Sequence, residues 1–137
     1  MKVFQINGLE IIQIPKIVDV RGNLAVIEGD LLPFSLKRVY FLYDIPSGAY
    51  RGGHAHREQQ EFLIAVSGSF KVVLQDRWGN KEKITLNKPN EGLLIPKMTW
   101  REIENFSSGA ICLVVASEVY DENDYIRDFD EFLSYIN

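Results

Sequence analysis

The chain has 137 residues, 46% of them hydrophobic and 25% charged, a balance typical of one globular domain spanning residues 1–137 and not of a disordered or fibrous protein. The formal net charge of −4 argues against a nucleic-acid-binding protein, and no apolar run reaches the length of a membrane span. The single cysteine, Cys112, cannot form an intramolecular disulfide, and the N-terminus lacks the apolar stretch of a signal peptide, so we expect a cytoplasmic protein.

The first third of the chain consists of short runs that favour strands. Residues 3–6, 9–15 and 23–29 suit strands near the edge of a sheet, where Pro15 is tolerated. Residues 36–45 are rich in aromatic and β-branched side chains, which favour a further strand.

The middle of the chain alternates apolar and polar residues with a period of two. Phe70, Val72 and Leu74 share one face of a predicted strand, and a turn around Gly79-Asn80 leads into the next run. We therefore expect a hairpin over residues 69–86. Three more strands are expected at residues 91–96, 99–105 and 110–117.

Only the end of the chain has the pattern of a helix. Phe129, Phe132, Leu133 and Ile136 recur at helical spacing, and Asp128 is placed to act as the N-cap. About ten short strands followed by one short helix predict an all-β sandwich or small barrel with no repeat and no second domain.

Two histidines carry the clearest functional signal. The spacing of Gly48, His54, His56, Glu61 and Gly68 reproduces the first motif of the cupin superfamily. On a strand, His54 and His56 lie on the same face, which in a barrel can be the lumen, where polar groups converge into a site. The alternative is a pair of histidines that are exposed or satisfied in the core.

The second cupin motif is only partly kept. Gly92, Pro96 and Asn105 match it, but Met98 replaces a glycine and Arg101 replaces the histidine that supplies the last metal ligand. A guanidinium has only donors and stays protonated, so it cannot bind a metal ion. We therefore predict no bound metal, and a fixed cation suited to an anionic substrate or an enolate.

Without a metal, the two imidazoles are candidates for proton transfer, because their ordinary pKa near 6.5 lies close to neutrality. Tyr40 can donate to a substrate oxygen or lie in the core. Arg21 and Arg51 can pair with phosphate or remain solvated loop cations, and Trp100 can stack on a ligand or fill the core. Glu61 is expected to brace the site.

With these motifs, the chain closely resembles the WxcM-like sugar 3,4-ketoisomerases. The resemblance runs from the "RGNL" turn to the "DYIRD" tail and includes "RGGHAH", "EGLLIP", "WREIENFSSGA" and "YDENDYIRD". It implies a cupin-type β-barrel or jelly roll with a short C-terminal helix, and a homodimer that exchanges N-terminal strands. It also implies conversion of dTDP-4-keto-6-deoxy-D-glucose into its 3-keto isomer without metal or cofactor, in the biosynthesis of amino-deoxysugars for surface glycans, O-antigens or antibiotics.

The resemblance also suggests roles for individual residues. His56 is favoured as the base and His54 as its support, although the spacing does not separate the two, and Tyr40 and Arg21 complete the catalytic set. The predicted substrate-binding residues are Arg51, Arg101, Trp100 and Glu61. Leu42 stands where a second tyrosine would have flanked the site.

Three other functions stay open on the sequence. A metal-dependent cupin enzyme would use His54, His56 and Glu61 as ligands. A non-catalytic module would bind the sugar nucleotide without removing the C3 hydrogen. A dTDP-sugar 3,5-epimerase would abstract a proton next to the same ketone but invert C3 and C5.

Overall fold

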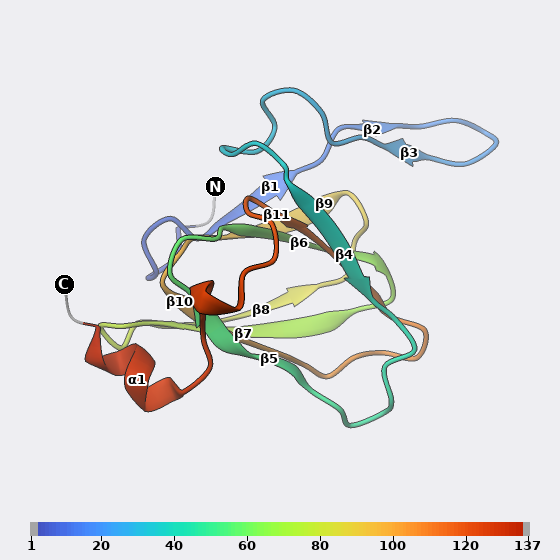
Figure 1. The fold of residues 1–137 in the computed structure, drawn as a ribbon. Helices are drawn as coiled ribbons and strands as arrows, with labels where there is room; N and C mark the ends of the chain where they lie inside the picture. The colour runs from blue at the N-terminus through green and yellow to red at the C-terminus, as the bar shows by residue number, and fades with distance from the viewer. Residues whose placement is uncertain (1–2, 136–137) are drawn as a thin grey trace.

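Two antiparallel five-stranded sheets face each other in the computed structural model, which describes residues 3–135 (Figure 1). The first sheet has the order β1 (Glu10–Gln13), β9 (Glu91–Ile95), β6 (Glu61–Ser67), β11 (Ile111–Ala116) and β4 (Arg38–Leu42). The second has the order β12 (Tyr125–Ile126), β5 (Arg51–His56), β10 (Thr99–Glu104), β7 (Phe70–Asp76) and β8 (Lys81–Leu86).

The main core fills the space between the sheets. β7 alternates strictly between buried and half-buried positions, and Phe70, Val72 and Leu74 point inward, as their spacing predicts. On β6, Leu63 points into this core, whereas Phe62 points outward and is covered by the loop that contains Leu32. The first sheet is therefore buried on both faces over part of its area.

A two-stranded arm extends from the first sheet. It is formed by β2 (Lys16–Ile17) and β3 (Leu24–Ala25), and Figure 1 shows it standing away from the two layers. Ile17, Val18 and Val20 on this arm are all exposed. An apolar hairpin of this kind gains little from the body of its own subunit, since its side chains remain in solvent.

The C-terminal segment returns to the second sheet. A 3-10 turn, η1 (Glu122–Asp124), leads into β12 and then into helix α1 (Phe129–Ser134), whose N-cap is Asp128. Phe132 of the helix packs against Trp100 on the outer face of the second sheet. Within residues 3–135, no helix is both long and apolar enough to cross a membrane.

The predicted all-β jelly roll with a short C-terminal helix is confirmed, as are the hairpin over 69–86 and the N-cap at Asp128. Ile136, predicted on the inner face of the helix, lies outside the described residues. The strand predicted at residues 3–6 is wrong, because the chain turns there: Leu9 N donates to Ile6 O, and Gly8 has a positive φ.

Candidate active site

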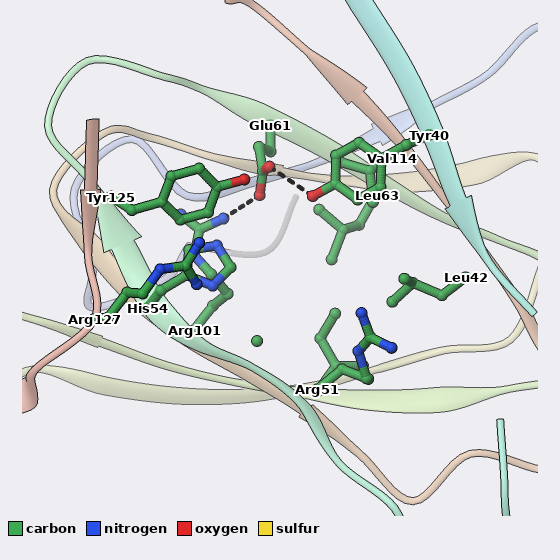
Figure 2. Close-up of a pocket in the computed structure, with 12 residues that line it drawn as sticks. Tyr40, Leu42, Arg51, His54, Glu61, Leu63, Arg101, Val114, Tyr125 and Arg127 are labelled. Carbon is green, nitrogen blue, oxygen red and sulfur yellow. Dashed lines mark hydrogen bonds and ion pairs between the residues drawn. The ribbon is translucent and has the colours of Figure 1, made fainter. Parts of the chain in front are cut away.

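A cavity of about 240 Å³ opens between the two sheets and is lined mostly by polar side chains (Figure 2). Its polar wall comes from strands of both sheets and from the C-terminal segment. The charged and aromatic residues around it are Tyr40, Arg51, His54, Glu61, Arg101, Tyr125 and Arg127.

Strand β5 places both histidines on the inner face of the second sheet. His54 lies opposite Arg101 on β10, and His56 lies opposite Tyr125 on β12. The pairing of β5 with β10 is irregular next to Arg101, and a Cβ on Gly52 would lie 3.0 Å from the Arg101 carbonyl. The glycines of "RGGHAH" thus permit a bulge, a device that re-aims side chains beside active sites.

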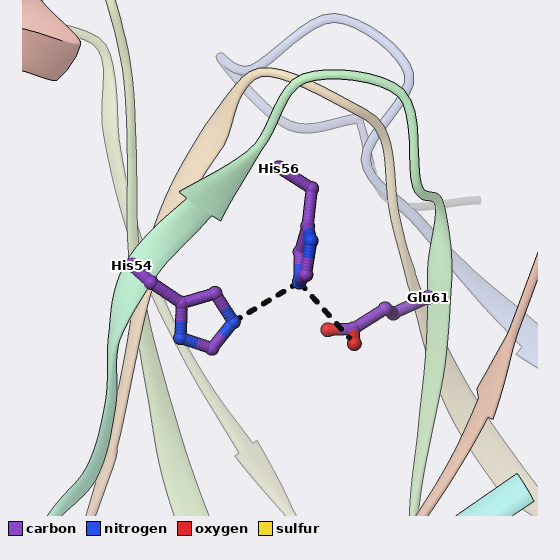
Figure 3. Close-up of side chains that lie close together, drawn as sticks. All are labelled: His54, His56 and Glu61. Carbon is purple, nitrogen blue, oxygen red and sulfur yellow. Dashed lines mark hydrogen bonds and ion pairs between the residues drawn. The ribbon is translucent and has the colours of Figure 1, made fainter. Parts of the chain in front are cut away.

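The two imidazoles contact each other directly. Their Nε2 atoms are 3.1 Å apart and their rings are nearly perpendicular, at 87° (Figure 3). His54 lines the cavity, whereas His56 lies behind it with 0% of its surface exposed. His56 Nδ1 lies 3.0 Å from Asp124 Oδ2. The contacts therefore run from the cavity to His54, then to the fully buried His56, and then to Asp124, 13% of whose side chain is exposed.

Glu61 is the centre of a buried polar network. One of its oxygens, Oε1, accepts from Arg101 Nη1, and the other, Oε2, accepts from the Tyr40 hydroxyl at 2.9 Å (Figure 2). Oε2 also accepts from Gln59 Nε2 at 2.7 Å. Burial alone would raise the pKa of Glu61, but Arg101 and then the two histidines outweigh it and hold that pKa well below its usual range. Glu61 is therefore an acceptor with fixed partners.

The same surroundings set the protonation of the neighbouring groups. Burial, and then the charge of Arg101, lower the pKa of His54 to about 3, so its ring is neutral at physiological pH. Burial, and then the Glu61 carboxylate, raise the pKa of Tyr40 far above its usual value. The cavity thus presents a neutral imidazole opposite a phenol that keeps its proton.

The residues do not fit a resident metal ion. His54, His56 and Glu61 offer ligand atoms within 4.8 Å of one another, as a metal site requires. However, Arg101 contacts one Glu61 oxygen, and Tyr40 and Gln59 donate to the other. A divalent cation would lie against a buried guanidinium and would displace donors already in place, so Coulomb repulsion opposes its binding.

Most of the predicted site residues come together. His54, His56, Tyr40, Glu61 and Arg101 form one connected cluster. Arg51 lines the same cavity at its exposed side.

Two predicted residues do not reach this cavity. Trp100 lies on the opposite face of β10 from Arg101 and packs against Phe129 and Phe132. It does not line this cavity, and its contact with the substrate stays a prediction. Arg21 lies on the arm between β2 and β3, forms an ion pair with Asp19, and leaves 86% of its side chain exposed. In its own subunit, Arg21 does not line the cavity.

Four residues of the site were not singled out from the sequence. Gln59 follows the histidines and donates to Glu61, and Asp124 bonds to His56. The Tyr125 ring lies 5.0 Å from the ring of His54 and 4.4 Å from that of His56, and Arg127 lies over Tyr125 at 4.2 Å. The last three fall within "YDENDYIRD", but nothing in that pattern indicates its pairing with β5.

Comparison with known proteins agrees with this geometry. A TDP-4-oxo-6-deoxy-alpha-D-glucose-3,4-oxoisomerase of Aneurinibacillus thermoaerophilus is 43% identical over 129 residues, covering 93% of this chain and 91% of that protein. A 3,4-ketoisomerase from Helicobacter canadensis is 46% identical, with a TM-score of 0.88 over 92% of this chain and 95% of that chain.

The sugar 3,4-ketoisomerase QdtA from Thermoanaerobacterium thermosaccharolyticum, solved with TDP, is 38% identical, with a TM-score of 0.91 over 94% of each chain. A mutant of that enzyme has been solved with TDP-4-keto-6-deoxyglucose. Residues 7–137 of this chain match the FdtA family, described as WxcM-like, C-terminal. The chain therefore belongs to the FdtA family of WxcM-like proteins.

Proposed function

We propose that this protein is an isomerase that converts dTDP-4-keto-6-deoxy-D-glucose into the corresponding 3-keto sugar by metal-free proton transfer. The observation that carries the proposal is the arrangement of a neutral imidazole, His54, and a protonated phenol, Tyr40, around one cavity. The relatives' names supply the substrate class, since they act on or bind TDP-linked sugars.

The reaction needs a base at C3 and a proton donor near the C4 oxygen. The ketone makes the C3 hydrogen acidic, and its removal as a proton leaves an enediolate whose charge spreads to O4. Protonation at O4 gives an enediol, and return of a proton to C4 with loss of the O3 proton gives the 3-keto isomer. No oxidant is required, because the hydrogen lost at C3 is regained at C4.

The structure favours His54 over His56 as the base, which reverses the order that the family resemblance suggested. His54 lines the cavity, whereas His56 is fully buried behind it and contacts it through Nε2. Tyr40 lines the same cavity, and we assign it as the donor to the ketone oxygen, for which its single O–H must turn away from Glu61. Arg101 supplies positive potential for the enediolate.

The diphosphate has candidate partners at the cavity's exposed side. Arg51 and Arg127 both line the cavity. Arg127 forms a bidentate pair with Glu122, a carboxylate with 56% of its side chain exposed, so a diphosphate can replace that carboxylate at little cost. We assign these two arginines to the anionic part of the substrate.

The arm suggests a homodimer with exchanged N-terminal strands. Its apolar side chains are exposed, and β4 with the residue that follows it presents a second exposed apolar row, made by Val39, Phe41 and Tyr43. Among the strands of residues 3–135, β4 pairs only with β11, so its other edge is free to pair. An exchanged arm would bring Arg21 to the cavity of the other subunit.

The direct test is to incubate the purified protein with dTDP-4-keto-6-deoxy-D-glucose in deuterium oxide and to follow the product by NMR. We expect loss of the C3 hydrogen and appearance of a 3-keto product, whose C4 configuration the same spectra define. Inversion at C3 and C5 would indicate an epimerase, and dTDP binding without exchange at C3 would indicate a non-catalytic module.

The exchanged arm is tested by complementation. Arg21→Ala and His54→Asn are each expected to be inactive alone. If Arg21 serves the other subunit, a refolded equimolar mixture contains heterodimers with one complete site and regains about a quarter of wild-type activity. If each arm serves its own subunit, the mixture stays inactive.

A further inference from the structure

Asp124 has a position that the proton-transfer scheme above does not use. Its Oδ2 atom lies 3.0 Å from His56 Nδ1 and accepts from the backbone N–H of Gln59 at 3.2 Å. Its Oδ1 atom accepts from the backbone N–H of Glu58 at 2.7 Å. Two backbone N–H groups therefore donate to this carboxylate beside the His56 ring, and only 13% of the Asp124 side chain is exposed.

These contacts decide which nitrogen of His56 carries hydrogen. Since the Asp124 carboxylate is surrounded by donors and acts as an acceptor, the His56 Nδ1 atom that faces it must be an N–H. The remaining nitrogen, Nε2, is then the only atom of this ring that can gain or lose a proton during turnover. That atom points at His54 Nε2, 3.1 Å away.

We propose that Asp124 is a positioning residue that fixes the Nδ1–H tautomer of His56 and thereby makes His56 Nε2 the proton acceptor for His54. This inference rests on the proposed ketoisomerase function. Because Nε2 of His56 is bare, the facing Nε2 of His54 carries the hydrogen of this contact in the resting enzyme. When the proton leaves C3, the C–H electron pair remains in the enediolate, and His54 takes up that proton at its other ring nitrogen, Nδ1, while its Nε2 proton passes to His56 Nε2. The resulting imidazolium of His56 is stabilised by Asp124 and by Glu61, whose Oε2 lies 3.5 Å from His56 Nε2.

The position of Asp124 follows from the pairing of β12 with β5. Tyr125 lies opposite His56 in that ladder, so the residue before it is held at the end of β5. A backbone hydrogen bond also joins these two segments, since Arg57 N donates to Asp124 O at 2.9 Å. Asp124 thus connects the C-terminal segment to the turn that follows the histidines. Its carboxylate is oriented toward His56 by the hydrogen bonds that it accepts from the backbone N–H groups of Glu58 and Gln59.

The tautomer can be read directly in the wild-type enzyme. The chain has only two histidines, so a protein labelled with ¹⁵N-histidine gives two pairs of imidazole ¹⁵N signals, which the His54→Asn variant assigns to their residues. We expect Nδ1 of neutral His56 to carry the proton and Nε2 to be bare. A neutral His56 with its proton on Nε2 would overturn the proposal without any change to Asp124.

Kinetics of Asp124→Asn provide the second test. Loss of tautomer control by an Asp–His pair costs up to about 10⁴ in turnover, and we expect kcat to fall by at least about 10²-fold while KM changes less than about threefold. The matched control is Asp121→Asn in the same 3-10 turn, whose carboxylate accepts from Asn123 N and contacts neither histidine. This variant should keep wild-type kcat.

A double-mutant cycle separates the positioning role from a structural one. If Asp124 acts through His56, then Asp124→Asn costs little more in a His56→Asn background than that background costs alone. If the two losses multiply, or if Asp124→Asn keeps kcat within about threefold of wild type, the proposal is wrong. An inactive wild-type enzyme with the expected His56 tautomer would instead contradict the proposed ketoisomerase function.

Discussion

Arg101 of β10 and Glu61 of β6 form an ion pair between the two sheets, and no more than 2% of either side chain is exposed. Removing one member of a buried pair leaves the other charge without compensation, which costs about 3–5 kcal/mol. We expect Glu61→Gln to lower the free energy of unfolding by that amount, as measured by chemical denaturation.

The matched control for this change is Glu58→Gln, because Glu58 pairs with Lys97 at the surface, where 72% and 58% of the two side chains are exposed. It should change stability by less than about 1 kcal/mol. Replacing both members together, as Glu61→Met with Arg101→Met, should be less destabilising than Glu61→Gln. A double variant that is less stable than the single one would contradict this account.

His54→Asn should lower kcat more than His56→Asn, since His54 lines the cavity and His56 acts through it. General acid–base groups contribute about 10²–10⁴-fold, so we expect His54→Asn near the upper end of that range and His56→Asn near the lower end. Both variants should keep dTDP affinity, measured by calorimetry. If His56→Asn is the less active one, His56 is the base, as the sequence first suggested.

Tyr40→Phe removes the proposed proton donor while leaving Glu61 bonded to Arg101 and Gln59. We expect kcat to fall by at least about 10²-fold and the free energy of unfolding to change by about 1 kcal/mol. The chemical step is measured as the rate at which the C3 hydrogen exchanges in deuterium oxide. The exposed Tyr43 provides the control, because Tyr43→Phe should leave the exchange rate unchanged.

The depressed pKa of His54 predicts loss of stability on acidification. The folded protein binds a proton at His54 only near pH 3, whereas the unfolded chain binds it near 6.5, so protons favour the unfolded chain between these values. His56, Arg101, Glu61 and Tyr125 all face this ring. We expect wild-type protein to lose about 1–2 kcal/mol more than His54→Asn between pH 7 and pH 5 in denaturant titrations. Equal losses would show that His54 binds protons equally in both states.

Chelators should leave the activity unchanged, because Arg101 takes the position from which the last metal ligand would come and pairs with Glu61. The measurement combines turnover after EDTA dialysis with metal analysis of the same sample. Stoichiometric iron, manganese or zinc, together with loss of activity on dialysis, would restore the metal-dependent alternative.

The sequence predicted the centre of this site because local geometry determines it. The spacing of His54 and His56 places both on one face of a strand, and their rings do meet. The same period of two could have excluded Trp100, since neighbours on a strand face opposite sides and Arg101 takes the inner one.

The rest of the site depends on contacts between distant parts of the chain. Asp124 lies 68 residues after His56, and only the pairing of β12 with β5 brings them together. Arg21 gave a functional signal by its family position, but its place on the arm could not be derived from residue types. Which histidine faces the cavity also depended on the packing of both sheets, which spacing does not encode.

The pair of Arg101 and Glu61 has a further consequence, because its members belong to opposite layers of the sandwich. Sliding one layer along the other would pull apart two charged side chains that are at most 2% exposed. Both members also line the cavity, so this ion pair opposes any change in the distance between the two sheets beside the histidines.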